Sequence, residues 1–394
     1  MSFRSAARAA LVGPGGPRRM LAAEVLILAM ALFSLSCNRS QTSTVPNHTA
    51  YVTLPQYGSV LLLNIDGAHG YITLGPQTPP VEGTTPTGLA LLPSKKFLYV
   101  ANSFGNSVST FNVNGDGSLT LTGTSTPAGS GPNTAVIDPS GQFLLVTNSV
   151  SNNISVFSID TTSGALSPVG GSPFFANAAP TQMIFTHSGA FVYVTNPGLG
   201  TVTGFSFDSA SGLLSQLPTS PVTSGNGAAA LAVDASESFL YVANTSAVNP
   251  LLATDGNISG FGIDSSTGAL TPLLGSPFTS PEGSGPSSIT VDPTGQFVYA
   301  VTPQSSSSIW CFTINRTIGP TNGQLVPVAN SPFSVASGGQ FAIFDPLGNF
   351  FFIGSASGHA IEAYTYNSTS GVPTLVRGSP FSTGVPPGRM VLSE

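Results

Sequence analysis

The chain has 394 residues, a length that suits either several ordinary domains or one large all-β unit. Its 45 Gly, 33 Pro and 7% charged residues are typical of short strands joined by tight turns, and 41% apolar residues exclude a disordered chain. From Cys37 onward six Lys and Arg stand against 15 Asp and Glu, a net charge of −9, which excludes a nucleic-acid-binding surface.

Residues 1–37 predict an export signal. Four arginines precede an apolar run at 25–35 that is too short to span a bilayer comfortably. The run ends at Ser36-Cys37, which resembles the end of a bacterial lipoprotein signal, where the cysteine is lipidated and becomes the mature N-terminus. Simple cleavage and an uncleaved anchor are the alternatives. We therefore expect an extracytoplasmic protein, anchored in the bacterial cell envelope by a lipid on Cys37 or else secreted, with 38–48 as a polar tether.

Beyond the tether, one phrase recurs six times along the chain. Its copies are LPSKKFLYVAN from Leu92, DPSGQFLLVTN from Asp138, THSGAFVYVTN from Thr186, DASESFLYVAN from Asp234, DPTGQFVYAVT from Asp292 and DPLGNFFFIGS from Asp345. Successive aligned phenylalanines lie 46, 48, 48, 58 and 53 residues apart. This spacing predicts four-stranded blades of a β-propeller.

Each repeat divides into four predicted strands, named A to D from the inside outward. In one repeat they are PNTAVID, QFLLVTN, ISVFSID and ALSPVGGSP. Strand D runs into a recurring Ser-Pro-Phe, and proline belongs on an edge strand because it cannot donate to a ladder. The turn after strand A carries Asp-Pro-x-Gly, which favours a tight turn.

The two ends of the repeat region complete each other. The last strand A is PPGRMVLSE from Pro386, and nothing follows it, whereas the segment from Ala50 begins with strand B. The sequence therefore predicts an all-β, seven-bladed propeller over 49–394, with four antiparallel strands per blade, closed by pairing of the C-terminal strand A with the N-terminal strands B to D.

The FLYVAN and FVYVTN phrases resemble the YVTN-repeat propellers and the lactonase-type seven-bladed propellers, which include 6-phosphogluconolactonase-like proteins. The resemblance covers roughly residues 49–394 and is carried by residues that shape the fold. It implies that, where a member is active, a sugar lactone is hydrolysed at the central funnel.

Strand direction assigns the loops to two faces. The B–C and D–A connections share the face on which propellers usually bind ligands. A candidate cation and a candidate base lie there, Arg389 near the start of the last strand A and His359 in a B–C loop. The acids on that face are Glu82 and Glu282 in D–A loops and Asp255 in a B–C loop. A paired strand-start arginine and an exposed loop histidine are the alternative interpretations. The residues aligned with Arg389 in the other blades are Gly88, Thr134, Gln182, Ala230, Ser288 and Phe341.

A lactonase needs a base to activate water and donors to stabilise an oxyanion. We expect Arg389 to be the electrophilic group and His359 or Glu282 to be the base. The predicted substrate-binding residues are Gln182, Asn133, Gln340, Asp255 and Glu82. The asparagines that end strand B, at 102, 148, 196 and 244, are assigned instead to hydrogen bonds within turns.

No cofactor or metal site is expected, because phosphate-binding, zinc-binding and nucleophile motifs are missing from the sequence and the calcium-like Asn112–Gly117 falls at a C–D turn. Two hypotheses remain for function. The preferred one is an exported binding or scaffold propeller, with a long B–C insertion after Asn244; the alternative is a sugar-lactone hydrolase. The expected partners are a small sugar-like ligand or an envelope protein, no nucleic acid, and a membrane through the lipid anchor alone.

Overall fold

The computed structural model describes residues 47–81, 84–245, 256–279, 285–303, 308–335 and 338–393, within one compact unit that extends from Pro46 to Glu394. The predicted export signal with Cys37 lies outside the described residues, as does the predicted tether up to residue 46. None of the helical structure in the described part of the chain is long and apolar enough to cross a membrane. His48, which the sequence places in the tether, is the first residue of β1 and is buried.

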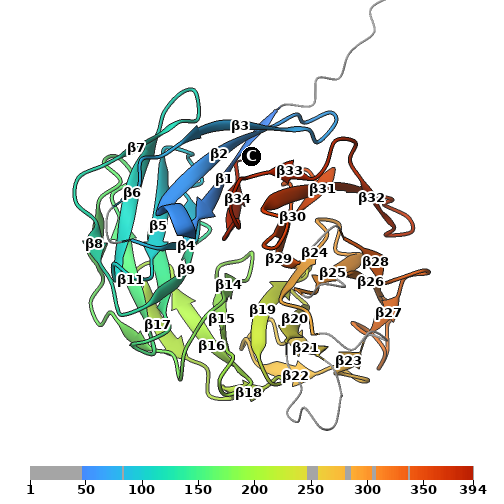
Figure 1. The fold of residues 1–394 in the computed structure, drawn as a ribbon. Coiled ribbons are helices and arrows are strands. Elements are labelled where there is room, and N and C mark those ends of the chain that lie inside the picture. The colour runs from blue at the N-terminus through green and yellow to red at the C-terminus, as the bar shows by residue number, and fades with distance from the viewer. Residues whose placement is uncertain are drawn as a thin grey trace, which may run out of the picture. The chain divides into compact units, whose positions relative to one another are not determined.

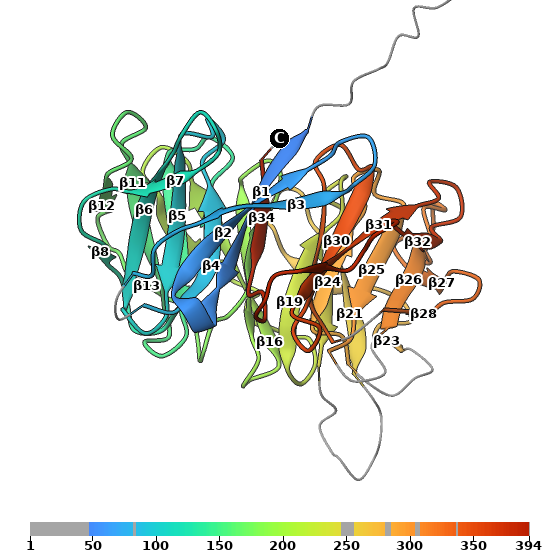
Figure 2. The same cartoon turned by 45° about the horizontal axis from the view of Figure 1, so that its top comes forward.

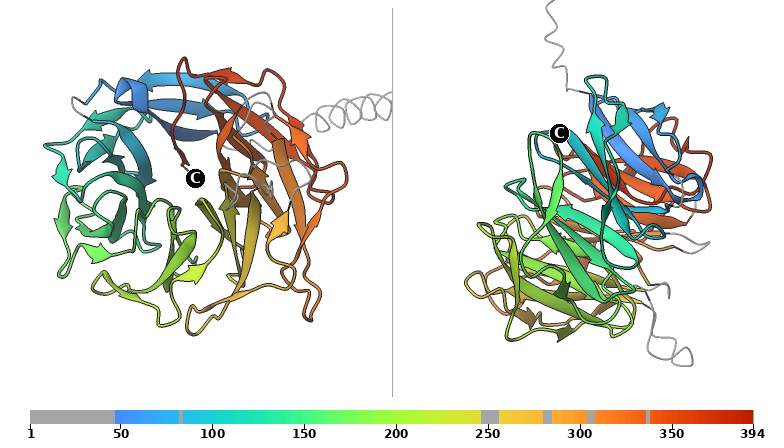
Figure 3. Two further views of the ribbon diagram at one scale, coloured as in Figure 1. Left: turned by 60° about the horizontal axis from the view of Figure 1, so that its bottom comes forward. Right: turned by 90° about the vertical axis from the view of Figure 1, so that its left-hand side faces the viewer.

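Seven antiparallel sheets stand around a central axis like the blades of a propeller (Figures 1 and 3). The innermost strands, strand A of each blade, are β4 (Pro86–Leu91), β9 (Pro132–Ile137), β14 (Met183–Phe185), β19 (Ala228–Val233), β24 (Ser288–Val291), β29 (Gly339–Phe344) and β34 (Met390–Leu392). Next come the strands B, which are β1 (His48–Leu54), β5 (Phe97–Asn102), β10 (Phe143–Asn148), β15 (Phe191–Asn196), β20 (Phe239–Asn244), β25 (Phe297–Val301) and β30 (Phe350–Ser355).

The strands C are β2 (Ser59–Ile65), β6 (Ser107–Val113), β11 (Asn153–Ile159), β16 (Thr201–Asp208), β21 (Asn257–Ile263), β26 (Ser308–Ile314) and β31 (Ala360–Tyr366). The strands D are β3 (Ile72–Gln77), β7 (Leu119–Leu121), β12 (Leu166–Pro168), β17 (Leu213–Gln216), β22 (Leu270–Pro272), β27 (Leu325–Pro327) and β32 (Pro373–Leu375). The described helical structure is one 3-10 turn, η1 (Pro55–Tyr57), between β1 and β2. The predicted fold class is confirmed.

The ring closes as the sequence predicts. The sheet order β3-β2-β1-β34 places the C-terminal strand beside the first described strand, and Tyr51 lies opposite Val391 (Figure 2). Thr53 N–H donates to the Arg389 carbonyl at 2.9 Å, and Ser393 N–H donates to the Thr49 carbonyl at 2.8 Å. The seventh blade is thus built from both ends of the propeller.

The outer edge differs from the prediction of one strand D per blade. In six blades two short segments share this edge, because a further strand pairs with the other half of strand C. These strands are β8 (Thr126–Pro127), β13 (Phe174–Phe175), β18 (Val222–Thr223), β23 (Phe278–Thr279), β28 (Phe333–Ser334) and β33 (Phe381–Ser382). The recurring Ser-Pro lies in the break between the two segments, so the proline needs no ladder partner.

The serine before that proline has a role that sequence reasoning missed. At the break, strand C has a backbone N–H with no strand opposite it, and the serine hydroxyl accepts its hydrogen bond. The bonds are Val156 N to Ser172 Oγ at 2.9 Å, Gly204 N to Ser220 Oγ at 2.6 Å, Gly260 N to Ser276 Oγ at 3.0 Å, Cys311 N to Ser331 Oγ at 2.9 Å and Ala363 N to Ser379 Oγ at 3.0 Å. The side chain thereby replaces a ladder acceptor.

Neighbouring blades are joined by a contact that repeats around the ring. The phenylalanine that opens strand B packs against a glycine with positive φ in the C–D turn of the next blade, as Phe297 does against Gly371. The tyrosine two residues later donates to the carbonyl of the same glycine, so Tyr299 Oη lies 2.8 Å from the Gly371 oxygen. Tyr99, Tyr193 and Tyr241 make the equivalent bond. The apolar core therefore lies between the blades.

Two recurring polar residues are structural, as predicted. Asp138, in the turn after strand A, accepts from Phe143 N–H at 2.7 Å and from Gln142 N–H at 2.8 Å. Asn148, at the end of strand B, is buried and donates to Ser155 Oγ at 2.9 Å on strand C. The calcium-like segment covers the end of β6 and the turn before β7, where Asp116 accepts from Ser118 N–H.

Replacing Gly371 with alanine should disrupt one joint between blades. A Cβ at Gly371 would lie 2.6 Å from Phe297 Cδ1, and φ is +73°. Gly378 has φ +86° with nothing within 4 Å of its Cβ position, so Gly378→Ala is a control with the same backbone strain and no clash. We expect Gly371→Ala to lower the free energy of unfolding by about 1–3 kcal/mol more than the control, measured by denaturant titration. Equal losses would contradict the packing role of this glycine.

Candidate functional site

The six residues that the repeat aligns with Arg389 lie with it at one level of the central channel. Gly88, Thr134, Gln182, Ala230, Ser288 and Phe341 join Arg389 in lining a cavity of about 220 Å³. They lie within the first three residues of each strand A, except Gln182 and Arg389, which lie just before it. Positions that are equivalent in the repeat therefore line one cavity.

A wider cavity of about 530 Å³ adjoins this level, and Arg389 lines both. Pro55, Pro197 and Pro303, from connections between strands B and C, form part of its wall. This funnel cavity therefore opens on the face that strand direction assigns to ligand binding. Its remaining lining residues are Thr87, Asn133, Thr181, Ala229, Ser287, Gln340 and Gly388.

Closure of the ring holds Arg389 in place. Its backbone N–H donates to Thr53 Oγ1 at 2.8 Å, its carbonyl accepts from Thr53 N–H at 2.9 Å, and Thr53 is buried. Gln182 is held in the same way, since its N–H donates to Thr195 Oγ1 at 3.1 Å. Both threonines lie on strand B, so the inner ladder sets the height of both side chains.

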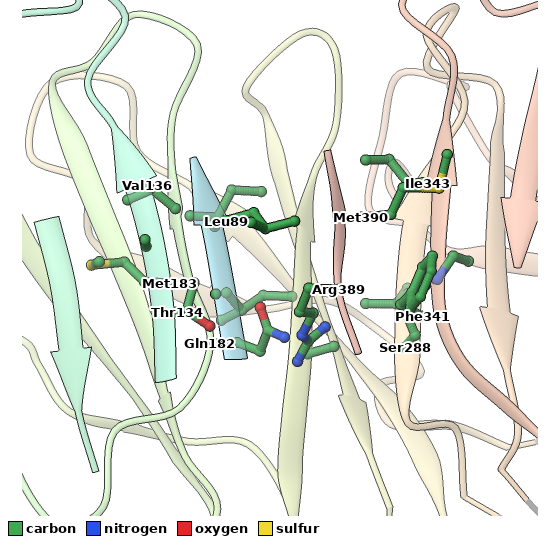
Figure 4. A pocket seen from close by; sticks show the side chains of 17 residues that line it. Leu89, Thr134, Val136, Gln182, Met183, Ser288, Phe341, Ile343, Arg389 and Met390 are labelled. Carbon is green, nitrogen blue, oxygen red and sulfur yellow. Dashed lines mark hydrogen bonds between the residues drawn. The ribbon is translucent and has the colours of Figure 1, made fainter. Parts of the chain in front are cut away.

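The side chains of Arg389 and Gln182 point toward each other across the channel (Figure 4). With its amide oriented to fit the hydrogen-bond network, the Gln182 carbonyl oxygen accepts from both terminal nitrogens of Arg389. Removal of water around the guanidinium lowers the pKa of Arg389 to about 10, which leaves the group charged at neutral pH. Among described residues, no carboxylate forms an ion pair with Arg389.

The other polar groups of the funnel cavity divide into two kinds. Thr87 Oγ1 donates to the Pro132 carbonyl at 2.9 Å and Ser287 Oγ donates to the Gly339 carbonyl at 3.0 Å, so these hydroxyls join neighbouring strands A. Asn133 is half-buried and Gln340 is exposed, and both line the funnel cavity. Their amides can donate to and accept from a bound polar molecule.

Of the remaining predicted site residues the structure describes His359, which lies apart from both cavities. His359 is exposed in the loop before β31. Glu282, Asp255 and Glu82 lie outside the described residues. In the part of the chain that the structure describes, neither cavity wall contains His, Asp, Glu, Lys or Cys.

Sequence reasoning missed the threonines on strand B, although the repeat carries a signal for them. The strand B phrase has Thr at residues 53, 147 and 195, and these blades place Arg389, Thr134 and Gln182 in the channel. Where the phrase has Ala101 or Ala243, the opposed channel residue is Gly88 or Ala230. A hydroxyl on strand B thus accompanies a longer polar residue on strand A in these blades.

Comparison with known proteins identifies the family of this chain. The family model described as lactonase, 7-bladed beta-propeller, matches residues 16–179 and 172–336. No curated protein compared with the chain matches it.

Several solved structures have a similar fold. A putative 6-phosphogluconolactonase from Bacteroides uniformis has a TM-score of 0.72 at 17% identity, covering 88% of this chain and 99% of its own. The periplasmic gluconolactonase of Pseudomonas aeruginosa has a TM-score of 0.71 at 17% identity, covering 89% of this chain and 99% of its own. At such identities these likenesses concern the fold alone.

Replacing Thr53 with valine should weaken the seam that carries Arg389. Valine keeps the shape of the side chain but leaves the Arg389 N–H without its 2.8 Å acceptor. We expect a loss of about 1–3 kcal/mol in the free energy of unfolding, measured by denaturant titration. Thr313→Val, at an exposed position on β26, is the control and should change stability by less than about 0.5 kcal/mol. Equal effects would contradict the positioning role of Thr53.

Proposed function

Because the chain belongs to the lactonase family of seven-bladed β-propellers, we propose that it hydrolyses a lactone ring in the funnel cavity. The observation that carries this proposal is the Arg389 guanidinium, which lies where the two central cavities meet. It is the one cation in the described lining of either cavity.

Hydrolysis of a lactone concentrates negative charge on one oxygen. Water attacks the carbonyl carbon and forms a tetrahedral oxyanion; the ring C–O bond then breaks, and the leaving oxygen takes up a proton as the hydroxy acid forms. Fixed donors aimed at that oxyanion lower the barrier because they need little reorganisation. Arg389 supplies two N–H groups at the level set by Thr53, and Gln182 restrains their direction.

The proton acceptor in this proposal is Glu282, taken from the sequence alone, because His359 lines neither cavity. The attacking water loses a proton to this base, which then returns it to the leaving oxygen. Asn133 and Gln340 would hold hydroxyl groups of the substrate at the wall of the funnel cavity, while Glu82 and Asp255 remain proposed contacts from the sequence.

We also propose that the protein works outside the cytoplasm. The basic and apolar leader with Cys37 supports export and lipid anchoring, and a protein of the same fold is described as periplasmic. The propeller would then meet its ligand in the cell envelope.

A second candidate is a receptor that binds the same class of ligand without turning it over. It is favoured by the composition of the described cavity walls, which provide a cation and amides but no group that could act as a base. Both candidates place the ligand against Arg389.

Turnover of glucono-1,5-lactone separates the two candidates. We expect the purified protein to open this lactone faster than the spontaneous reaction, and Arg389→Gln to lower kcat/KM by about 10²–10³-fold because the oxyanion loses its charged donors. Arg377→Gln, at an exposed position on the outer edge, should leave the rate unchanged. A pH-stat assay measures the acid released. A rate with protein equal to the spontaneous rate would refute the hydrolase. Lactone binding without turnover would then favour the receptor.

A further inference from the structure

We propose that the ligand of this site carries a short aliphatic chain next to its carbonyl or carboxylate group, and that this chain lies in the smaller central cavity beyond Arg389. The inference deepens the proposed function, on which it rests for the position of the carbonyl. It assigns a preferred ligand class, an aliphatic lactone and its open hydroxy acid, which should bind more tightly than the fully hydroxylated sugar lactone that serves above as the test substrate.

The smaller cavity is apolar beyond the level of Arg389. One residue further along each strand A, its wall consists of Leu89, Ala135, Met183, Leu231, Ile289, Ala342 and Met390. Val136, Ile184 and Ile343 follow and are half-buried, so they keep a surface that a ligand could cover. Figure 4 shows Leu89, Val136, Ile343 and Met390 on one side of the Arg389–Gln182 pair.

The size of this cavity suits a group of several carbon atoms. Its volume is about 220 Å³. A protein cavity of about 150 Å³ lined by aliphatic and aromatic side chains binds benzene, so a chain of a few carbon atoms together with its carboxylate beside Arg389 matches the size of this cavity. Hydroxyl groups placed against Val136, Ile184 and Ile343 would lose their hydrogen bonds to water without gaining new ones from these side chains.

Where the two cavities meet, the positive charge of Arg389 favours an anion or a developing oxyanion. Arg389 stands between the polar funnel cavity and the apolar cavity, and its described partner is the neutral amide of Gln182. A carboxylate can replace the amide oxygen as acceptor for the guanidinium fork, and the Gln182 amide can rotate so that its NH₂ donates to the same carboxylate. A ligand with a carboxylate head and an aliphatic tail therefore satisfies both surfaces at once.

Calorimetric titration of the purified full-length protein with simple carboxylates tests this assignment without turnover. The probes are acetate, butanoate, hexanoate and gluconate. We expect the Kd to fall about fourfold for each methylene group from acetate to hexanoate, and hexanoate to bind more tightly than gluconate. Equal affinity for acetate and hexanoate, or tighter binding of gluconate, would overturn the inference.

Three variants locate the two ends of the ligand. Val136→Thr makes the apolar wall polar and should weaken hexanoate binding while leaving acetate binding unchanged; Val326→Thr, at an exposed position on β27, is the matched control. Gln182→Glu places a carboxylate against Arg389 and should abolish binding of every probe without lowering Tm. Hexanoate binding that survives Gln182→Glu in the folded protein would place the site elsewhere and refute the proposal.

The binding titrations test the ligand class separately from the hydrolase activity. Chain-length-dependent binding without turnover of any lactone would uphold the ligand class and refute the hydrolase. Turnover of glucono-1,5-lactone with no gain in affinity from acetate to hexanoate would uphold the hydrolase and refute the ligand class.

Discussion

The antiparallel pairing of β1 with β34 is the constraint on which the centre of the molecule depends. It joins the two ends of the propeller and sets the register of the strand that carries Arg389, with Tyr51 opposite Val391. A shift of one residue in such a ladder would turn every side chain to the opposite face of the sheet. The hydrogen bond from Arg389 N–H to Thr53 Oγ1 belongs to this same strand pair. The pairing that closes the ring therefore also positions the guanidinium.

The residues that join the blades and the residues that line the channel occupy different places in the fold. The contact between Phe, Tyr and the turn glycine lies between neighbouring sheets, and it repeats with little change at Tyr99, Tyr193, Tyr241 and Tyr299. Leu145 and Phe352 occupy the tyrosine position in two blades and remain fully buried, so the apolar part of the contact persists without the hydroxyl. Because the contacts between blades stabilise the fold, the residues of strand A that line the channel can differ from blade to blade.

The repeat predicts which residues lie at the same height along the channel, but it does not predict which side chains meet across the channel. The fold, the closure and the channel residues at the height of Arg389 follow from the repeat period, because equivalent positions in a closed ring must lie at equivalent heights. The contact between Arg389 and Gln182 does not follow, because side-chain length and direction decide which members of a ring meet. The break in strand D was also missed, since Ser-Pro reads equally well as the end of an edge strand. His359 lies in the expected B–C loop but is exposed. Assigning a residue to a loop gives the face of the propeller on which it lies and does not say whether its side chain points into the channel.

Relatives with about 17% identity share the scaffold, and the scaffold leaves the chemistry of the channel to a few positions on each strand A. In this chain those positions form successive levels: hydroxyls and amides of the funnel cavity, the Arg389–Gln182 pair, then aliphatic side chains. A strand running along the axis would bring each level into contact with a different part of the proposed ligand. Ligand selection would then depend on the order of polar and apolar residues along strand A, while Thr53 and Thr195 fix the height at which that order changes.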